Sequence, residues 1–277
     1  MKFFFLLARR VPDVPSQIVL DVSAELARRG HKTTFMIPEE SLTPLGDIPC
    51  DHDLYLLKSY TELSLSLAGA LDARGASLIN PFAGCVAARN KIVCYQVLRV
   101  AGVPVPQSWV TSDFSLLKPL LQQFPLIVKP NMGWRGEGVT LVRTEKNLEN
   151  LRVPSGPVLI QEYIRNNGED LRLYIAGDQV FGIRKRFSET SFSIPGEPVA
   201  VSSEVREIAL RCGRAFGMQL YGLDIIEGPD GPRVVDVNYF PGFKGVPGAA
   251  LAVADCIERF ARASGTFQAN SLAEVTR

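Results

Sequence analysis

Three oxygen-bearing side chains lie within a short stretch near the C-terminal end of the sequence. Asp236 and Asn238 are two residues apart in an alternating run typical of a β-strand, so they face the same side. Asp224 lies in an apolar run upstream, and the turn-forming residues 228–232 predict a hairpin that brings Asp224 beside them. These hard ligands are too few to enclose an ion alone, which suits Mg²⁺ because it keeps positions for water and nucleotide phosphates. The alternative is a solvated hairpin with acids on its exposed face.

Two lysines could hold the phosphates of such a nucleotide. Lys129 ends the apolar run Leu126–Val128, where a positive charge is unfavourable unless an anion meets it. The alternative for Lys129 is a side chain that extends to water. Lys91 begins a predicted helix, where its charge opposes the helix dipole, and an anion held by Lys91 and the free backbone N–H groups would offset that effect. The alternative for Lys91 is an ordinary surface lysine.

A glycine-rich segment follows Lys129. In NMGWRGEG, residues 131–138, the residues Gly133, Gly136 and Gly138 make a strand–loop–strand that can fold over phosphates with its backbone amides. The segment is neither a P-loop nor the dinucleotide-binding fingerprint, whose glycines have another spacing and open a helix. A hairpin with additional glycines is the alternative interpretation.

A hinge is predicted where the strand at 158–163 ends. Its last residues, Gln161–Ile164, are followed by the turn-forming residues Asn166-Asn167-Gly168. A hinge there would offer backbone N–H and C=O groups to an adenine edge, with Glu169 or Asp170 near the ribose. Considered alone, the segment is only a loop.

Basic residues gather on the next two predicted strands. Alternation along Gln179–Arg186 places Arg184 and Arg186 on one face and Lys185 on the other, and Arg172 lies on the strand before. A basic run is usually a solvated edge strand. If it faces a metal and a polyphosphate, it would instead neutralise the charge that moves during phosphoryl transfer.

Three groups of predicted elements must position these residues. Residues 1 to about 80 alternate strands and helices, which implies a small parallel α/β domain. Its strands are predicted at Lys2–Ala8, Thr33–Ile37, Asp53–Leu57 and Ser77–Ile79, and its helices at Ser16–Arg29 and Glu62–Arg74.

Asn80-Pro81 marks a boundary, after which two further lobes are predicted. The second lobe has strands at Gln107–Val110, Leu126–Lys129, Gly138–Val142 and Val158–Tyr163, and helices at Lys91–Val100, Phe114–Gln122 and Lys146–Leu151. The third has strands at Leu171–Ala176, Gln179–Arg186, Leu220–Ile226 and Arg233–Asn238, and helices at Ser203–Phe216 and Ala249–Ala263. The expected domains are 1–80, 81–163 and 164–264, with a flexible tail at 265–277.

Composition excludes several classes of function. The chain is 46% hydrophobic with a net charge of +1, so neither a basic excess for nucleic acid nor a membrane-spanning apolar run is present. The start of the chain imitates a signal peptide, but its apolar run stops after six residues, so a buried strand is expected. Five scattered cysteines without a CxxC pattern indicate reduced thiols and a cytoplasmic protein. His31 and His52 lack ligand-like spacing and are expected at surface or turn positions.

Taken together, these segments resemble the ATP-grasp superfamily. The resemblance covers nearly the whole chain, in the order NKIVCYQVLRVAGVPVPQSW, FPLIVKPNMGWRGEGVTLV, LIQEYI, EDLRLYIAGDQVFGIRKR, and YGLDII with VVDVNYFPG. It implies a three-lobed α/β fold in which a first, parallel α/β lobe precedes two α+β lobes that clasp ATP. It also implies ATP and one or two Mg²⁺ ions as cofactors, with Mn²⁺ as a substitute.

Within the superfamily, DVNYFPGFKGVPG is similar to the metal motif of the inositol-trisphosphate kinase branch. This resemblance implies metal ligands at Asp224, Asp236 and Asn238 and phosphate contacts at Lys91 and Lys129. It implies nucleotide contacts at Gln161, Glu162, Tyr163, Ile164 and Ser188, and substrate contacts at Arg10, Lys58, Arg172, Asn238 and Gly242. The branch's histidine after the Lys129 strand is missing, however, and NMGWRGEG is similar instead to ligases that add amino acids to a carboxylate, such as the ribosomal-protein glutamate ligase type.

Three functions follow from the resemblance. The first interpretation is a kinase that moves the γ-phosphoryl group of Mg-ATP to a small anionic acceptor, a polyol phosphate of the inositol type. The second is a carboxylate–amine ligase that acts through an acyl phosphate, and the third is a non-catalytic ATP-binding module. In either enzyme, Arg172 with Lys185 or Arg186 would steady the moving group. The partner is expected to be a small anionic molecule, with no nucleic acid and no membrane, and the sequence specifies no oligomeric state.

Overall fold

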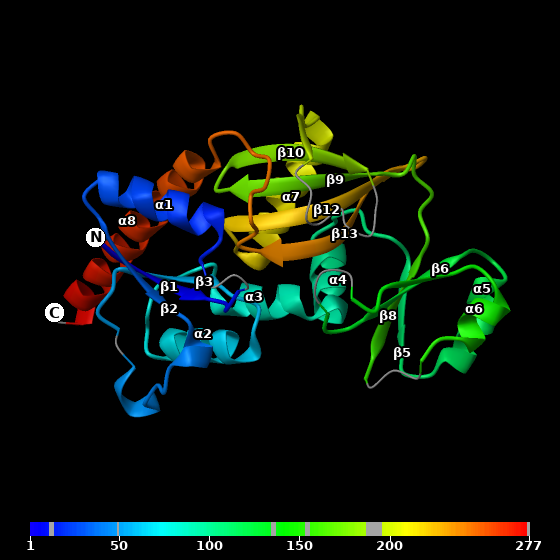
Figure 1. Cartoon of the computed structure of the whole chain (residues 1–277), viewed down its shortest axis with the longest axis horizontal. Coiled ribbons are helices and arrows are strands. Elements are labelled where there is room, and N and C mark those ends of the chain that lie inside the picture. Colours follow the sequence, from blue (N-terminus) through cyan, green and yellow to red (C-terminus); the bar gives the residue numbers. More distant parts are fainter. Residues whose placement is uncertain (11–13, 49, 134–136, 153–155, 187–195, 276–277) are drawn as a thin grey trace.

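The computed structural model describes residues 1–10, 14–48, 50–133, 137–152, 156–186 and 196–275. The molecule is elongated, with both termini near one end and the sheet that contains β5 to β8 at the other (Figure 1). Three sheets organise it, one in each predicted lobe. The exact lobe boundaries stay a prediction.

The first sheet is parallel, as the alternation of strands and helices predicted. Its strands have the order β2-β1-β3-β4, and β1 lies in the middle because its residues are almost entirely apolar. The elements are β1 (Lys2–Leu7), β2 (Lys32–Met36), β3 (Leu54–Lys58), β4 (Leu78–Ile79), α1 (Gln17–Arg28) and α2 (Glu62–Ala73).

The second sheet is antiparallel, with the order β5-β8-β6-β7. Its strands are β5 (Ser108–Thr111), β6 (Leu126–Pro130), β7 (Thr140–Val142) and β8 (Val158–Glu162), and its helices are α4 (Lys91–Val100), α5 (Lys118–Leu121) and α6 (Glu145–Glu149). The helix expected at 114–122 is divided into a 3₁₀ turn and the short α5, which begins at Lys118 with Pro119 in its first turn.

The third sheet is also antiparallel and has the order β11-β10-β9-β12-β13. Its strands are β9 (Glu169–Ala176), β10 (Gln179–Arg186), β11 (Glu197–Val199), β12 (Leu220–Gly228) and β13 (Gly231–Tyr239), accompanied by α7 (Ser203–Phe216) and α8 (Ala249–Val275). The strand β11 was not expected. The helix α8 also continues well beyond the predicted end at Ala263, and only its backbone is described in the segment 265–275.

One helix was missed entirely: α3 (Phe82–Arg89) follows the boundary at Asn80-Pro81. Asn80 itself is buried and ties the first lobe to the third sheet. Its amide nitrogen donates to Leu220 O at 2.6 Å, and its amide oxygen accepts from the N–H groups of Gln219 and Leu220. The residue predicted to separate two lobes therefore joins the first lobe to the third.

The hydrophobic cores show which lobes contribute residues to the same buried cluster. Two core clusters each combine residues of the first lobe with residues of the third, for example Leu57 with Ile175 and Phe5 with Val253. The second sheet has a small core of its own, which includes Val128 and Ile160. Among the described residues, the second sheet therefore packs a core separate from the other two, whereas α4 contributes Cys94 and Leu98 to a core shared with the first and third lobes.

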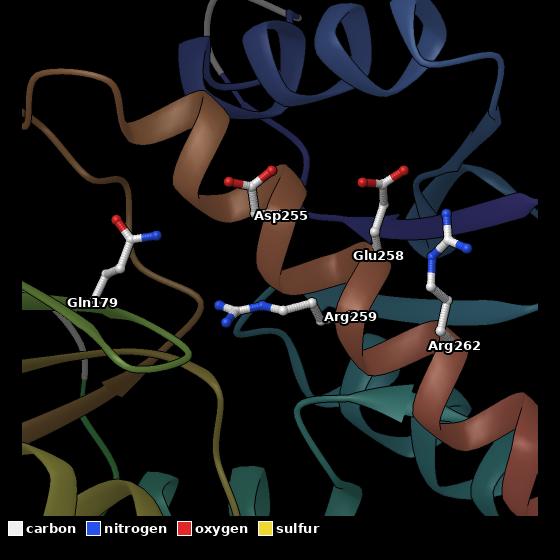
Figure 2. Close-up of a pocket in the computed structure, with 5 residues that line it drawn as sticks. All are labelled: Gln179, Asp255, Glu258, Arg259 and Arg262. Atoms are coloured by element: carbon white, nitrogen blue, oxygen red, sulfur yellow. The ribbon is translucent and has the colours of Figure 1, made fainter.

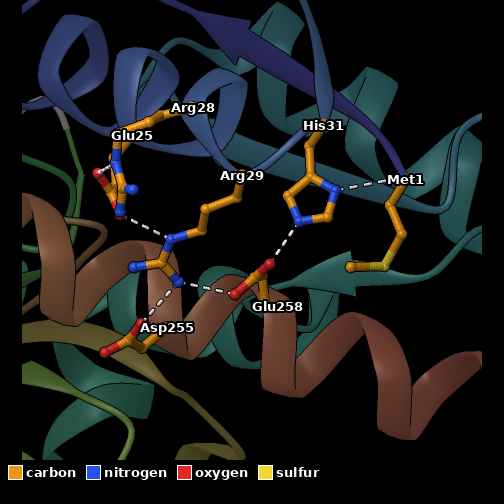
Figure 3. A network of polar contacts seen from close by, with 7 residues as sticks. All are labelled: Met1, Glu25, Arg28, Arg29, His31, Asp255 and Glu258. Carbon is orange, nitrogen blue, oxygen red and sulfur yellow. Dashed lines mark hydrogen bonds and ion pairs between the residues drawn. The ribbon is translucent and has the colours of Figure 1, made fainter.

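Polar contacts also fasten α8 to α1 (Figure 3). Arg29 donates to Asp255 and Glu258 on α8, and Glu258 also contacts the ring of His31. His31 directly follows the turn at residues 29–30, in line with its expected place, but its side chain is only 9% exposed and accepts from the amino group of Met1.

All five cysteines are free, as expected. Within the described residues, no helix combines the length and the apolar character that crossing a lipid bilayer requires.

Candidate active site

The β12–β13 hairpin brings the three predicted metal ligands onto one face of the third sheet. Asp224 pairs directly with Asp236, and Gly222 pairs with Asn238. Because cross-strand partners share a face and residues two apart on a strand do too, all three side chains are on the same side. The amide nitrogen of Asn238 donates to Asp236 Oδ2 at 3.2 Å. The predicted constellation is thus present in the structure, and its role stays a prediction.

A β-bulge lies within this constellation. The register shifts by one between Asp224 and Ile225, so that Val235 is the additional residue on β13. The carbonyl oxygen of Val235 accepts a hydrogen bond from Lys129 Nζ at 3.0 Å. The bulge therefore provides the contact through which β6 of the second lobe reaches the third.

Lys91 makes a second link between these parts. Its Nζ lies 3.2 Å from Asp236 Oδ1. Burial lowers the pKa of Lys129 to about 8, although nearby Asp236 opposes the shift and nearby Lys91 adds to it. Both predicted phosphate lysines thus converge on the candidate metal ligands, as the sequence suggested.

The prediction that free backbone N–H groups at the start of α4 help Lys91 to hold an anion was wrong, because these groups have partners within the protein. The N–H of Ile92 is held by the side-chain oxygens of Asn90 and Asn131, and that of Val93 by Asn90. The N–H of Lys91 donates to the carbonyl of Asn131. These side chains cap the helix, so only the ammonium group of Lys91 is directed at the candidate site.

Arg172 on β9 pairs with Asp224 on β12. Its guanidinium donates two hydrogen bonds to the Asp224 carboxylate, from Nε to Oδ1 at 2.5 Å and from Nη2 to Oδ2 at 2.7 Å. Burial would lower the pKa of Arg172, but Asp224 outweighs this and the pKa is raised. Asp170 lies on the same face, and burial together with the charge of Asp224 raises its pKa. Arg172 is therefore anchored on a metal-ligand candidate.

The basic strand β10 divides as the alternation predicted. Lys185 pairs with Asp170 and so lies on the face of Arg172, and burial and then the charge of Arg172 lower the pKa of Lys185. Arg184, on the other face, forms ion pairs with Glu169 at 3.7 Å and with Glu227 at 2.7 Å.

Of three further nucleotide and catalytic candidates in this region, the structure places one away from the cluster, and two fall outside what it describes. Glu169 is three residues from Arg172, hence on the opposite face of the sheet from Asp224, so the structure does not bring it to the metal ligands. The side chain of Arg186 and the whole of Ser188 lie outside the described residues.

The hinge candidates mainly hold the second sheet together. Gln161 is buried and donates to Ser108 Oγ at 3.0 Å, and Glu162 accepts from the N–H of Gln107 at 2.9 Å. The ring of Tyr163 lies under the guanidinium of Arg143, and its N–H donates to Pro125 O. Ile164 lies against Gly228 at the end of the hairpin. Any adenine contact here would use backbone groups rather than the Gln161 and Glu162 side chains.

The glycine-rich loop is described only in part. Gly133 has no positive φ, whereas Gly138 has a φ of 73° and leaves no room for a Cβ, which would lie 2.7 Å from Pro130. Gly136 lies outside the described residues. The role of the loop over phosphates stays a prediction.

The substrate candidates Lys58 and Arg10 lie near each other at the first lobe. Lys58 ends β3, and burial together with the charge of Arg10 lowers its pKa to about 8. Its Nζ lies 5.4 Å from the ring centre of Phe240, two residues after Asn238. The first lobe therefore places positive charge close to the loop that follows the metal motif.

That loop, residues 240–248, contains Gly242 and an unexpected cation. Phe240 and Phe243 have φ values of 38° and 49°, which non-glycine residues seldom adopt. Both rings are buried, and Phe243 stacks on Tyr174 at 5.4 Å, so packing offsets the strain. Lys244 lies close enough to Lys185 to lower its pKa.

Sequence reasoning did not single out Lys244, Tyr60 or Asn131. Lys244 could have been found from its place within DVNYFPGFKGVPG, the segment that is similar to the metal motif. Tyr60, whose pKa is raised by burial and by the nearby Tyr239 and Asp236, follows the β3 end and donates to the carbonyl of Tyr239. No pattern in the sequence predicts that contact, because the two residues are far apart along the chain.

The donor set fits Mg²⁺. Two carboxylates and an amide oxygen are hard ligands that leave coordination positions for water and phosphate oxygens. Among the described residues, no three His, Cys, Asp or Glu side chains form a group able to hold a metal. The set here differs from such a group because its third member is Asn238, so a bound nucleotide would have to supply further ligands.

A separate surface hollow lies between α8 and the start of β10 (Figure 2). Its lining residues are Gln179, Asp255, Glu258, Arg259 and Arg262. Its charges have structural partners, since Arg259 pairs with Asp178 while Asp255 and Glu258 pair with Arg29. Gln179 is at the other end of β10 from Lys185, roughly 20 Å away at the rise of a strand. The hollow is thus distinct from the candidate site.

The chain is similar to a family of known proteins and to several solved structures. A family model described as a RimK-like ATP-grasp domain matches residues 88–255. A probable alpha-L-glutamate ligase of Xanthomonas oryzae is 33% identical over 207 residues, which cover 69% of this chain and 70% of that protein.

Solved structures show the same fold. The RimK domain protein of Sphaerobacter thermophilus superposes with a TM-score of 0.77 at 21% identity, covering 94% of this chain and 99% of that one. The D-alanine–D-alanine ligase of Bacillus anthracis, solved with ATP, superposes with a TM-score of 0.71 at 20% identity, covering 98% and 99%. These likenesses confirm the multi-lobed α/β fold expected from the sequence.

Proposed function

The chain belongs to the RimK-like ATP-grasp family, and on that premise we propose that it is an ATP-dependent ligase that joins a carboxylate to an amine. The observation that carries the proposal is the family match together with the convergence of Lys91 and Lys129 on the carboxylate face of β12 and β13. The metal motif resembles the inositol-trisphosphate kinase branch, but the matches support the ligase interpretation, which the glycine-rich loop also suggested.

The proposed reaction has two steps. A carboxylate oxygen of the substrate attacks the γ-phosphorus of ATP, and the bond to the β-phosphate oxygen breaks, which gives an acyl phosphate and ADP. The amine then attacks the carbonyl carbon, the bond from that carbon to the phosphate oxygen breaks, and an amide, inorganic phosphate and a proton are released.

One group of residues would bind the metal and the phosphates of ATP. Asp224, Asp236 and Asn238 would hold Mg²⁺, which neutralises phosphate charge when bound. Lys91 and Lys129 would bind the phosphates as charged donors. Both lysines are assigned this role because they reach β13 from the second lobe and lie beside the candidate metal ligands.

The cations around the acceptor would stabilise the charge that develops there. Arg172 and Lys185 lie on the carboxylate face and would contact the acyl phosphate, where the protein contributes position and charge. Lys58 and Arg10 of the first lobe would bind an anionic group of the acceptor. The acceptor is accordingly expected to be a small molecule or a short peptide with a carboxylate.

ADP release measured with paired substrates tests the proposal. Acidic amino acids and short peptides are offered as carboxylates, alone and together with amines, and inositol phosphates are offered alone. A ligase requires both partners and yields a product whose mass equals that of an amide. A phosphate ester formed from one acceptor would instead establish the kinase interpretation and overturn the ligase.

A further inference from the structure

Both candidate metal carboxylates are already paired with side-chain cations. Arg172 holds both oxygens of Asp224, at 2.5 and 2.7 Å, and Lys91 contacts one oxygen of Asp236 at 3.2 Å. The other oxygen of Asp236 accepts from Asn238. Three of the four carboxylate oxygens therefore have a cationic partner, and the fourth has an amide donor.

The side chains of these ion pairs are partly buried. The side chains of Arg172 and Asp224 are 33% and 23% exposed, and those of Lys91 and Asp236 are 17% and 33% exposed. At such partial burial, hydrogen bonds between charged groups are stronger than on an open surface, and water can still reach them. A divalent ion can therefore enter, but it must displace a bound cation to reach either oxygen of Asp224 or the Oδ1 atom of Asp236.

The displaced ammonium and guanidinium groups find new acceptors only when a phosphate is present. Lys91, Lys129, Arg172 and Lys185 lie around two carboxylates, so a metal that entered alone would add positive charge to a site already rich in cations. A nucleotide polyphosphate reverses that balance, because its oxygens can accept the ammonium and guanidinium groups while the metal takes the carboxylates.

We propose that Arg172 and Lys91 act as place-holders: in the nucleotide-free protein their charged groups occupy the carboxylates of Asp224 and Asp236. The metal ion then binds productively only together with the nucleotide. The inference rests on the proposed function in taking Asp224 and Asp236 as metal ligands. On metal–nucleotide binding, the guanidinium of Arg172 leaves Asp224 and becomes available to the acceptor phosphate. Arg172 thus has a positioning role before it has any role in the reaction.

Mn²⁺ binding without nucleotide, measured by electron paramagnetic resonance or calorimetry on the full chain, tests the inference. In Arg172→Met, Asp224 loses its partner, and we expect Mn²⁺ to bind about tenfold more tightly or better, given the strength of hydrogen bonds between charged groups. Lys91→Met should act in the same direction through Asp236, and it serves as a second variant if Arg172→Met folds poorly. An ATP analogue that cannot be hydrolysed should tighten Mn²⁺ binding to the unaltered protein.

Arg184→Met is the matched control. It removes the same charge from the neighbouring strand of the same sheet, but Arg184 pairs with Glu169 and Glu227 on the other face. Its Mn²⁺ affinity should stay within about twofold of the unaltered protein, since the charge of Arg184 is already offset by its ion pairs with Glu169 and Glu227. Equal tightening in Arg184→Met would show a general charge effect and overturn the proposal.

Two further results would contradict the inference. One is an unchanged Mn²⁺ affinity in folded Arg172→Met and Lys91→Met, and the other is Mn²⁺ binding to the unaltered protein that is as tight without the nucleotide analogue as with it. Neither measurement involves an acceptor or turnover. If the variants bind Mn²⁺ more tightly but the ligase assay fails, only the proposed function is rejected. If the ligase assay succeeds but Mn²⁺ binding is unchanged, only the place-holder role is rejected.

Discussion

Asp236 is the residue on which the candidate site converges. Its carboxylate contacts Lys91 and Asn238, it pairs with Asp224 across the hairpin, and its charge influences Lys129. Removing it would leave a proposed metal one carboxylate short and leave two lysines without their counter-charge.

We predict that Asp236→Ala lowers the turnover number on the order of a thousandfold, because charge stabilisation by a metal contributes several kcal/mol. Steady-state ADP release measures the effect, and circular dichroism checks the fold. Asp230→Ala, on the exposed turn of the same hairpin, should retain turnover. Loss of fold in Asp236→Ala would assign the residue a structural role instead.

The second prediction concerns proton uptake by Lys129, whose pKa burial lowers to about 8. At about pH 8.5 much of this amine is neutral in the free protein, and nucleotide phosphates favour its charged form, so ATP binding should take up a proton. Near pH 7 the amine is already charged and the uptake should vanish. Calorimetry in buffers of different ionisation enthalpy measures it.

Two variants separate Lys129 from other groups. Lys129→Arg should lose the uptake, because arginine stays charged throughout this range. Lys58→Met should keep it, although the pKa of Lys58 is also about 8, because Lys58 faces the acceptor side. The same uptake in Lys129→Arg would remove Lys129 from the nucleotide site.

Much of the site could be predicted at this scale from residue type and spacing. Asp236 and Asn238 are two apart, and the turn before them brings Asp224 opposite, so local rules were sufficient. Local rules did not predict that Asn131 would cap α4, because that contact joins segments that only the tertiary fold brings together.

At the scale of elements, most helices and strands follow from periodicity, and the exceptions have physical reasons. The helix α7 has the bounds that its apolar spacing and the Ser202 cap indicate. The helix α3 was missed because it is short and follows Asn80-Pro81, a pattern that otherwise marks a turn. Its stability comes from close packing on α7, which no local pattern records.

That packing gives the third prediction. A Cβ on Gly84 of α3 would lie 2.3 Å from the carbonyl oxygen of Phe216, a backbone atom that cannot rotate away. Gly84→Ala should lower the free energy of unfolding by about 1–3 kcal/mol, as overpacking does. Gly46→Ala, with no atom within 4 Å, is the control and should change little. Equal urea midpoints for both variants would contradict the packing argument.

At the scale of the molecule, the first and third lobes share their cores with each other and with α4, and the second sheet packs a core of its own. The sequence predicted three lobes, but it did not indicate this unequal partition. Apolar faces are recognisable in a sequence, whereas the partners that they meet across the chain are not.

The fourth prediction tests the partition with two equivalent truncations, measured by hydrogen exchange. Ile160 and Ile175 are both fully buried, in the core of the second sheet and in a shared core respectively. Ile160→Ala should raise exchange mainly in residues 108–162, whereas Ile175→Ala should raise it in both the first and the third sheet. Uniformly raised exchange in Ile160→Ala would show a single cooperative unit.

The central claim is that the reaction passes through an acyl phosphate, and oxygen-18 in the substrate carboxylate tests it most directly. In the proposed reaction one carboxylate oxygen becomes part of inorganic phosphate and the other stays in the amide. Mass spectrometry should therefore find one labelled oxygen in each molecule of released phosphate. Phosphate without label, or a phosphate ester in place of an amide, would contradict the account.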